Sequence, residues 1–568
     1  MRRKLSLIFF FLGLAICIAS CSSYSISYIP ATYEFGLLQV LPPWFWFGFA
    51  VCLLSFLEGI NRDKESVFFI KSLLLAMLIW NIPTLLLSHP YAPGSYMHIF
   101  EATPIMLSGH VPPASETLPY IFKYYPVSFP GYHILLTSIF QVTNIAPLWF
   151  AKYYPLFSVA VTFLVIWLFF RTFLPSAGYR WALLVAILAN VYMQFQLSPQ
   201  SAGLVAGLLT LVALEKDGWP WKVIAILLFA FIIISHPTTA FIVLSAAGLA
   251  WLLRMLLVRD RKTLLEPVPL LVIGWIAWSM FYASPFQQAV AGLATTAPTV
   301  PTAPTGPIAL IGPTAPATGI VFLDIFISET WKRLYGVFYW APRIRLIVLG
   351  VFGIGSVYYL VRQWLNKASR SQRLLITYTA FLIAPVIMTL IDITILRAGQ
   401  LHDRYFLFFL LVASILVVRL AEGFRYPIRK NSFLLALVFL ALFNFTTIYY
   451  QSSLFITSDE TISASEFVNN NTSSQVIGGR QLVPDLADPY QSAILRQSRF
   501  YHLYPQPLSS LVLPSVIVFD DHGRLWYEIW YGIEKYDFYV QEAKVDDNLD
   551  RVYSNSRYNI YWFAGDEG

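Results

Sequence analysis

The chain has 568 residues, of which 57% are hydrophobic and 12% are charged, with a mean hydropathy of +0.62. This composition excludes an ordinary soluble domain and is typical of a protein that crosses the membrane many times. The net charge of +7 falls mostly in short loops, so it indicates membrane topology and not a nucleic-acid-binding surface. The three cysteines, Cys17, Cys21 and Cys52, lie in or beside the first two apolar segments and indicate neither a disulfide framework nor a thiolate metal site.

Apolar runs of about 20 residues, each long enough to cross about 30 Å of hydrocarbon, predict about thirteen transmembrane helices. They cover residues 5–20, 43–60, 66–88, 149–170, 179–195, 199–214, 221–235, 238–258, 267–284, 344–364, 374–396, 405–421 and 433–450. Basic residues gather on alternate connections, which places the N-terminus of a plasma-membrane protein in the cytoplasm. Segment 126–145 is also apolar, but counting it as a span would move every later basic loop outside. We therefore expect an interfacial or re-entrant helix there.

The first run also allows a second interpretation. Arg2, Arg3 and Lys4 precede it, and Ile18 to Cys21 resembles a lipoprotein cleavage box, so the run fits either a retained helix or a signal peptide.

Three parts are predicted along the chain. Residues 1–64 form two N-terminal helices, and residues 65–450 form the main transmembrane domain, with outer loops at 89–147 and 285–319. The second loop is rich in Pro, Thr and Ala, which favours a flexible tether that can carry O-linked sugars; a lid or acceptor-binding loop is the alternative. The pattern of residues 451–568 predicts a small extracytoplasmic α/β domain. Its strands are expected at 475–478 and 515–519, and a hairpin is expected at 551–562. Asn470 and Asn471 each begin an Asn-x-Ser/Thr pattern there.

The first outer loop holds the candidate site, because ionisable groups there can meet a substrate without entering hydrocarbon. Its candidates are His89, His98, Glu101, His110, Glu116, Lys123 and His133. His98 and Glu101 are spaced i, i+3 and share a helix face, so they predict a base held in register or part of a metal site. Further ligands would come from His89 or His110. The alternative is that the pair only solvates an amphipathic helix.

Several segments of this loop and of the C-terminal half resemble one family. They are GSYMHIFEA at 94–102, LSGHVP at 107–112, the Tyr-Pro to Gly-Tyr-His segment at 125–133, the segment from Arg397 to Tyr405, and the hairpin at 551–561. Together with the order of parts, they resemble the GT-C superfamily of membrane glycosyltransferases. The similarity is to archaeal members related to dolichyl-phosphate-mannose transferases and to the catalytic subunit of oligosaccharyltransferase.

The resemblance implies a mainly α, GT-C-like fold. It also implies that the protein transfers a sugar from a polyprenyl-phosphate-linked donor to a glycan, lipid or protein acceptor. Glu101 and His98 are then the predicted catalytic residues, with a divalent cation, Mg or Mn, as a candidate cofactor. A cation such as Arg404 would stabilise the departing phosphate. The predicted substrate-binding residues are His89, Lys123, Tyr124, His236, Arg397, Asp403 and Arg404, and Lys332 is a further candidate cation.

One departure from the family leaves a second function open. Where GT-C enzymes usually carry an acid in this loop, the chain has Gly94 or Ser95. A catalytically degenerate subunit that binds lipid-linked glycan is therefore the alternative. A lipid or glycan transporter is a third interpretation, but it predicts internally repeated helix groups, and the sequence shows no convincing repeat.

Overall fold

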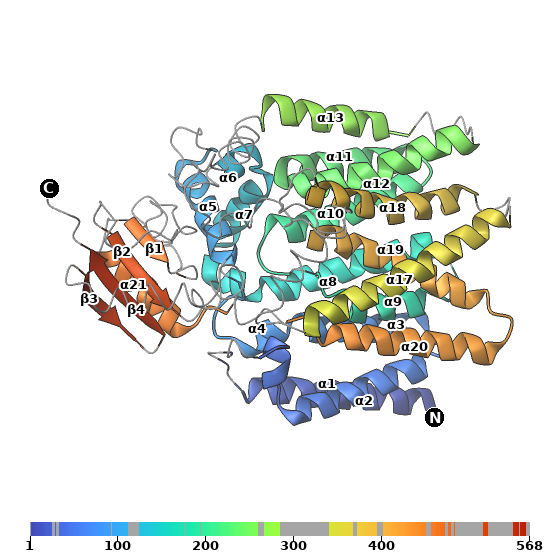
Figure 1. The fold of residues 1–568 in the computed structure, drawn as a ribbon, viewed down its shortest axis with the longest axis horizontal. Coiled ribbons are helices and arrows are strands. Elements are labelled where there is room, and N and C mark those ends of the chain that lie inside the picture. Colours follow the sequence, from blue (N-terminus) through green and yellow to red (C-terminus); the bar gives the residue numbers. More distant parts are fainter. Residues whose placement is uncertain are drawn as a thin grey trace, which may run out of the picture.

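The computed structural model describes residues 2–24, 26, 29, 33–92, 94–111, 124–174, 176–193, 195–258, 266–283, 340–366, 372–394, 402–449, 456–471, 475–478, 482, 515–520, 549–555 and 557–563. Roughly aligned helices form one bundle, and a small sheet domain lies beyond one end of it (Figure 1). Five predicted features lie outside the described residues: the loop 285–319, the candidate acid Glu116, and the candidate cations Lys123, Lys332 and Arg397.

Seven described helices are long and apolar enough to cross a membrane. They are α1 (Arg2–Ser22), α8 (Pro147–Phe173), α12 (Pro237–Leu253) with its continuation η3 (Arg254–Val258), α17 (Trp340–Leu365), α18 (Gln372–Thr394), α19 (His402–Glu422) and α20 (Pro427–Phe445). Shorter apolar helices are α2 (Pro43–Gly59), α9 (Tyr179–Ala189), α10 (Pro199–Glu215), α11 (Trp219–Ser235) and α13 (Val268–Phe281). With α3 (Glu65–Trp80), every predicted run contains a helix, so the predicted polytopic helical fold is confirmed.

Two predicted runs are interrupted inside the bundle. The third run breaks after α3, where Pro83 lacks a backbone N–H and a short helix, α4 (Ile82–Leu86), follows. The helix α9 has 11 residues and rises only about 16 Å, less than the hydrocarbon thickness. Asn444 Nδ2 satisfies its broken end by donating to Ala189 O at 2.6 Å, and Asn190 Nδ2 joins this end to α19 by donating to Leu407 O at 3.0 Å. Irregular backbone is thus buried in protein and not exposed to lipid.

Near the sheet domain, the first outer loop folds into α5 (Gly94–Ser108), α6 (Tyr124–Ser128) and α7 (Gly131–Thr143). The 13 residues of α7 rise about 20 Å, too little to cross the bilayer. Asn144 ends the helix in the left-handed region, at φ 53°. This length agrees with the expectation of an interfacial or re-entrant helix.

The C-terminal domain is a four-stranded sheet in the order β1-β2-β4-β3. Its strands are β1 (Gln475–Gly478), β2 (Ser515–Asp520), β3 (Leu549–Ser554) and β4 (Tyr558–Phe563), and α21 (Asp459–Asn471) precedes them. The β1 and β2 strands are parallel and the other pairs antiparallel. Ala464 and Val468 of α21 pack on Val516, Val518 and Ile560, which forms a separate small core. The predicted strands and hairpin are confirmed.

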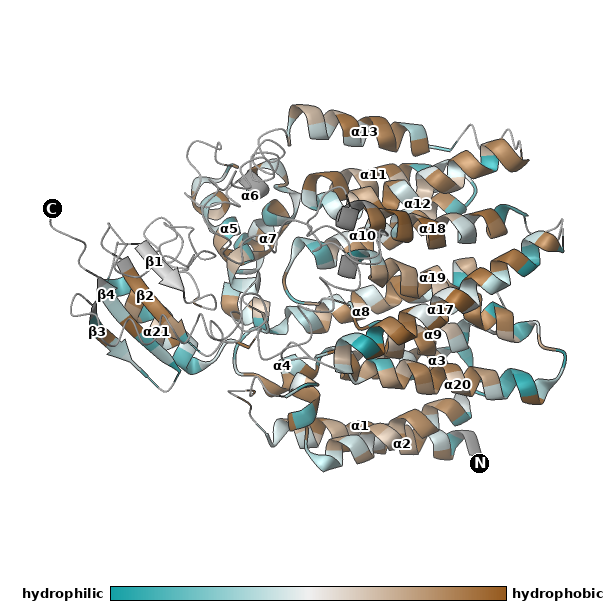
Figure 2. Cartoon of the chain, in the orientation of Figure 1, coloured by the Kyte–Doolittle hydropathy of each residue, from teal (hydrophilic) through white to brown (hydrophobic). Residues whose placement is uncertain are grey.

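Hydropathy follows this division. Hydrophobic residues run along the helices, whereas the sheet domain mixes both kinds (Figure 2). The N-terminal end of α1 lies at the end of the bundle opposite the sheet domain (Figure 1). The start of α1 and the sheet domain therefore lie at opposite ends of the bundle; the membrane side of each stays a prediction.

A buried ion pair joins α1, α2 and α3 near that N-terminal end. Lys71 Nζ lies 2.9 Å from Asp63 Oδ2, and the two side chains are 1% and 4% exposed. Lys71 Nζ also donates to Ser6 Oγ at 2.9 Å and to Ser55 O at 3.4 Å. The ammonium group of Lys71 therefore contacts acceptors from α1, from α2 and from the segment that follows α2.

Candidate functional site

Two histidines converge on one buried carboxylate in the first outer loop. Glu101 Oε2 lies 2.8 Å from His98 Nδ1 on the same helix, α5, and 2.9 Å from His133 Nε2 on α7. The side chains of Glu101 and His133 are 5% and 0% exposed, and that of His98 is 20% exposed. We call these three residues the His-Glu cluster.

The cluster forms because α5 and α7 pack closely. Ile99 and Ala102 of α5 share a buried apolar core with Leu136 and Phe140 of α7 and Ala151 of α8. On α7, polar residues recur every four positions and face α5. Besides the contact of His133 with Glu101, Thr137 Oγ1 donates to Ala102 O at 3.2 Å, and Gln141 Nε2 donates to Met106 O at 3.2 Å. This polar row fixes the position of α7 along α5.

Opposing effects set the charge of Glu101. Burial raises the pKa of this carboxyl, but hydrogen bonds from His133 and His98, together with their positive charge, outweigh it and hold the pKa well below its ordinary value. Glu101 is therefore ionised at neutral pH. Such a carboxylate is a weak proton acceptor, but it orients an imidazole or binds a metal well.

His98 is the most exposed member of the cluster. Its Nδ1 is used by Glu101, so Nε2 is the ring nitrogen that can exchange a proton with a substrate. The rings of Tyr132 and His133 lie beside it, with centroids at 6.1 and 5.7 Å. This packing holds the imidazole in one orientation.

A third histidine lies at the corner between α11 and α12. His236 Nδ1 lies 2.8 Å from Thr239 Oγ1 and accepts from the Thr239 backbone N–H at 3.2 Å, so the neutral ring carries its proton on Nε2. Burial lowers the pKa of His236, and the positive charges of Arg404 and His98 lower it further. His236 is thus a neutral hydrogen-bond donor at neutral pH.

The same interactions show where Arg404 lies. Arg404 Nη1, near the start of α19, donates to Thr238 Oγ1 at 3.0 Å, two residues after His236. Gly131, two residues before His133, lies against Ser235, so the late arginine and the His-Glu cluster both lie near the corner between α11 and α12. This is the placement that a shared site requires.

Gly131 sets the approach of α7 to α11. A Cβ atom at this position would lie 2.5 Å from Ile234 Cγ1 and 2.6 Å from Ser235 Oγ. Only glycine therefore allows the start of α7 to lie directly on the end of α11. Gly131 comes two residues before His133, and Ser235 comes one residue before His236.

Other predicted site residues lie elsewhere. His89 Nε2 is 2.7 Å from Asp459 Oδ1 at the start of α21, so His89 joins the bundle to the sheet domain. His110 is exposed, with its Nδ1 3.0 Å from Ser108 O. Tyr124 and Asp403 lie in α6 and α19. The expected third ligand from His89 or His110 is thus replaced by His133.

His133 was not among the predicted catalytic residues. Its contact with Glu101 spans 32 residues and depends on how two helices pack, which spacing along one helix does not reveal. The available signal was the i, i+4, i+8 row of His133, Thr137 and Gln141 in a mostly apolar segment.

The donor set of the cluster can be compared with the cations expected from the sequence. Its three ligand atoms lie within 4.8 Å of one another. Two imidazole nitrogens and one carboxylate suit Zn²⁺, whereas Mg²⁺ prefers an all-oxygen shell. The residues present therefore fit a divalent ion, and zinc better than magnesium.

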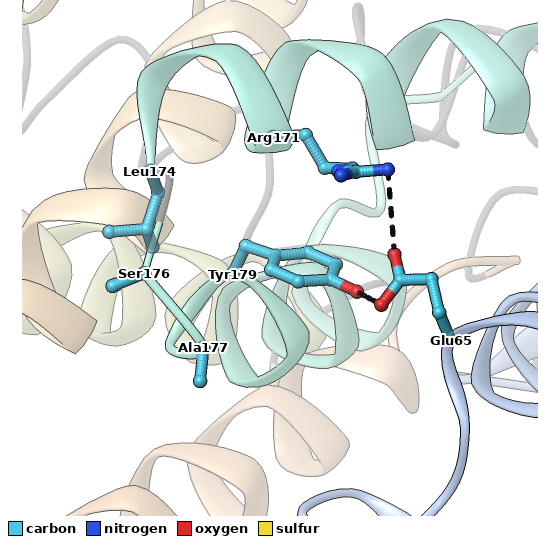
Figure 3. Close-up of a pocket in the computed structure, with 6 residues that line it drawn as sticks. All are labelled: Glu65, Arg171, Leu174, Ser176, Ala177 and Tyr179. Atoms are coloured by element: carbon cyan, nitrogen blue, oxygen red, sulfur yellow. Dashed lines mark hydrogen bonds and ion pairs between the residues drawn. The ribbon is translucent and has the colours of Figure 1, made fainter.

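A small polar pocket lies at the other end of α8 (Figure 3). It is lined by Glu65, Arg171, Leu174, Ser176, Ala177 and Tyr179. Glu65 Oε1 lies 3.7 Å from Arg171 Nη1, and the Tyr179 hydroxyl donates to Glu65 Oε2 at 2.5 Å. Helical rise from Ala151, beside the cluster, to Arg171 is about 30 Å. The pocket thus belongs to the opposite membrane face, where its paired charges join α3, α8 and α9.

The fold and the site define a polytopic helical membrane protein with a buried His-Glu cluster beside a membrane-proximal sheet domain. No family model matches the chain, and no curated protein sequence matches it. Among solved structures, it is similar to the crystal structure of the Archaeoglobus fulgidus oligosaccharyltransferase in complex with Zn and sulfate, with a TM-score of 0.44 and 13% identity. The match covers 71% of this chain and 55% of that one, so the chain corresponds to little more than half of that protein. A likeness of this degree concerns the arrangement of the helices and not the reaction.

Proposed function

We propose that the chain is a membrane glycosyltransferase of GT-C type. It moves a sugar from a polyprenyl-phosphate-linked donor to a glycan, lipid or protein acceptor at the membrane face that carries the sheet domain. The observation that supports this most directly is the location of the His-Glu cluster and Arg404 near the same corner, between α11 and α12. A lipid-phosphate donor needs both a proton acceptor and a fixed cation at the same membrane face.

In the proposed reaction, His98 is the base and Glu101 is its positioning residue. The base is the neutral form of His98: its Nε2 takes the proton of the acceptor hydroxyl while Glu101 accepts the hydrogen bond from Nδ1–H. The acceptor oxygen attacks the anomeric carbon, and the bond from that carbon to the phosphate oxygen breaks with its electron pair on the phosphate. Arg404 stabilises the departing anion, because its planar guanidinium can bind two phosphate oxygens. Neutral His236 donates Nε2–H to an uncharged oxygen of the donor.

The cluster also supports a metal-bound alternative, in which His98 is a ligand and not the base. His98 Nδ1, Glu101 and His133 Nε2 would hold a divalent ion, which supplies a Lewis acid beside the reacting oxygens. To bind it, the two ring nitrogens must give up the protons that they share with Glu101. Metal affinity would then decrease as the pH falls.

Glycan transfer in membranes tests the proposal. His98→Ala and Glu101→Gln should each lower turnover by about 100-fold or more, because general-base catalysis contributes on that order. Ser138→Ala is the matched control, since Ser138 is exposed on α7 and donates only to Ile134 O within its own helix. The assay supplies a panel of polyprenyl-phosphate-linked sugars. Unchanged turnover in His98→Ala at normal protein levels would exclude the proposed base.

A catalytically degenerate subunit is the second candidate, and the start of α5 favours it. Ser95 is fully buried and Gly94 has no side chain, so neither family position presents an acid. This candidate predicts that the unaltered protein binds lipid-linked glycan but transfers nothing from any donor in the panel. Transfer that depends on His98 would exclude it.

The proposal includes a location. The protein is placed in the plasma membrane with its N-terminus in the cytoplasm and its sheet domain outside, where lipid-linked sugars and acceptors are its partners.

A further inference from the structure

The last turn of α21 exposes two adjacent asparagines. In the sequence Asn469-Asn470-Asn471-Thr472-Ser473, two acceptor patterns for N-linked glycans overlap: one runs from Asn470 to Thr472 and the other from Asn471 to Ser473. Asn470 and Asn471 are both exposed. Neither the fold nor the proposed transferase site uses them.

The packing of α21 leaves this end of the helix accessible. Ala464, Ser465 and Val468 are buried on the side that faces the domain interior. The two asparagines follow at the point where the helix ends, and the first residue of β1 comes only four positions after Asn471. Terminal helical turns unwind readily, so Asn470 and Asn471 in the last turn of α21 can leave the helix to enter an enzyme active site.

The two asparagines differ in their hydrogen bonds. Asn471 Nδ2 donates to Phe467 O at 2.8 Å, which satisfies one of the carbonyls left unpaired at a helix C-terminus. Among the described residues, the Asn470 side chain has no hydrogen-bond partner. A role in ending the helix explains Asn471 but not Asn470.

We propose that Asn470 is a site of N-linked glycosylation, and that the donor is a polyprenyl-phosphate-linked oligosaccharide. Asn470 Nδ2 attacks the anomeric carbon of the donor and loses one proton. The new C–N bond replaces the bond between that carbon and the phosphate oxygen, and the polyprenyl phosphate species leaves with the electron pair. Because the side chain points away from the small core, a bulky glycan fits without disturbing the sheet. The proposal does not depend on what the His-Glu cluster does.

Overlapping patterns allow a sharp test with the full-length chain in the membranes of its own host. Mass spectrometry of the peptide that contains residues 459–478 measures site occupancy. Thr472→Ala removes the Asn470 pattern and leaves that of Asn471, whereas Ser473→Ala removes only the Asn471 pattern. We expect a glycan on Asn470 in the unaltered chain and in Ser473→Ala, and its complete loss from Asn470 in Thr472→Ala.

Asparagine substitutions provide the second pair of variants. Asn470→Gln should remove the modification, while Asn471→Gln should keep it, because Asn470-Gln-Thr472 is still an acceptor pattern. The two asparagine variants should reach the membrane at the level of the unaltered chain, since Asn470 and Asn471 are exposed, and the level of all four variants is measured alongside occupancy. An unmodified Asn470 in the unaltered chain, or a glycan that is lost in Ser473→Ala and kept in Thr472→Ala, would overturn the assignment.

Discussion

The two ends of the bundle bury charge in different ways. At the N-terminal end, Lys71 and Asp63 form an ammonium-carboxylate pair that is almost fully enclosed. At the end next to the sheet domain, Glu101 is enclosed to a similar degree, but its partners are His98 and His133. Lysine and aspartate keep their charges over ordinary pH changes, whereas imidazoles exchange protons or bind metals near neutral pH. Equal burial thus encloses groups of fixed charge at one end and groups that can exchange protons or bind a metal at the other.

The largest stability effect should come from breaking the pair at the N-terminal end. Lys71→Met leaves Asp63 buried without its partner, and the loss of one member of a buried pair costs about 3–5 kcal/mol. Thermal or denaturant unfolding in detergent measures this loss. The double variant Lys71→Met with Asp63→Asn should recover most of it, because no uncompensated charge remains. Equal instability of the single and double variants would show that the lysine acts through its packing and not its charge.

A smaller and pH-dependent effect is expected at the cluster. Hydrogen bonds to a charged group contribute about 1.5–3 kcal/mol, so Glu101→Gln should lower the free energy of unfolding by that amount at pH 7. The pKa of Glu101 in the fold is below its ordinary value of 4.5, so its contribution is complete above pH 4.5 and is lost as the pH falls further. Unfolding of both proteins from pH 7 down to the lowest pH that detergent tolerates measures the difference.

The control for this series is Glu466→Gln, since Glu466 is exposed on α21 and should change stability little at any pH. If the free energies of unfolding of the unaltered protein and Glu101→Gln differ by a constant amount down to strongly acidic pH, the effect comes from the shape of the side chain and not from its charge.

The smallest effect is expected in the polar pocket of Figure 3. Glu65 and Arg171 are 45% and 51% exposed, and exposed ion pairs contribute only about 0–1 kcal/mol. Glu65→Gln should therefore lower stability by no more than about 1 kcal/mol and leave glycan transfer unchanged. A loss as large as that of Lys71→Met would mean that this pocket supports the fold as strongly as the buried pair does.

The sequence predicts the fold well because its main determinants are local. Apolar length and basic loops are enough to predict the thirteen helices, and Pro83 marks the break after α3. The end of α9 at Asn190 carries no such local signal. It is stabilised by Asn444, whose amide reaches Ala189 O across 255 residues. Tertiary contacts of this kind are not visible in the hydropathy of a single segment.

The candidate site is only partly predictable for the same reason. His98 and Glu101 lie on one helix, so i, i+3 spacing was enough to pair them. His133 reaches Glu101 from another helix, and no spacing rule connects them. His89 lies closer to His98 in sequence than His133 does, yet it pairs with Asp459 of the sheet domain. Proximity in sequence therefore wrongly suggested His89 as a partner of the pair, whereas helix packing brings His133 to Glu101.

The glycine at 131 has a consequence for how the site responds to a reaction. Since Gly131 has no side chain, the backbone of α7 lies directly against the Ile234 and Ser235 side chains of α11, which keeps the helix ends that carry His133 and His236 close together. Polar groups that are held in this way need little reorganisation when charge moves from one bound species to another. The close contact of α7 with the end of α11 would thus reduce the activation barrier of the proposed transfer, although Gly131 itself does not touch the substrate.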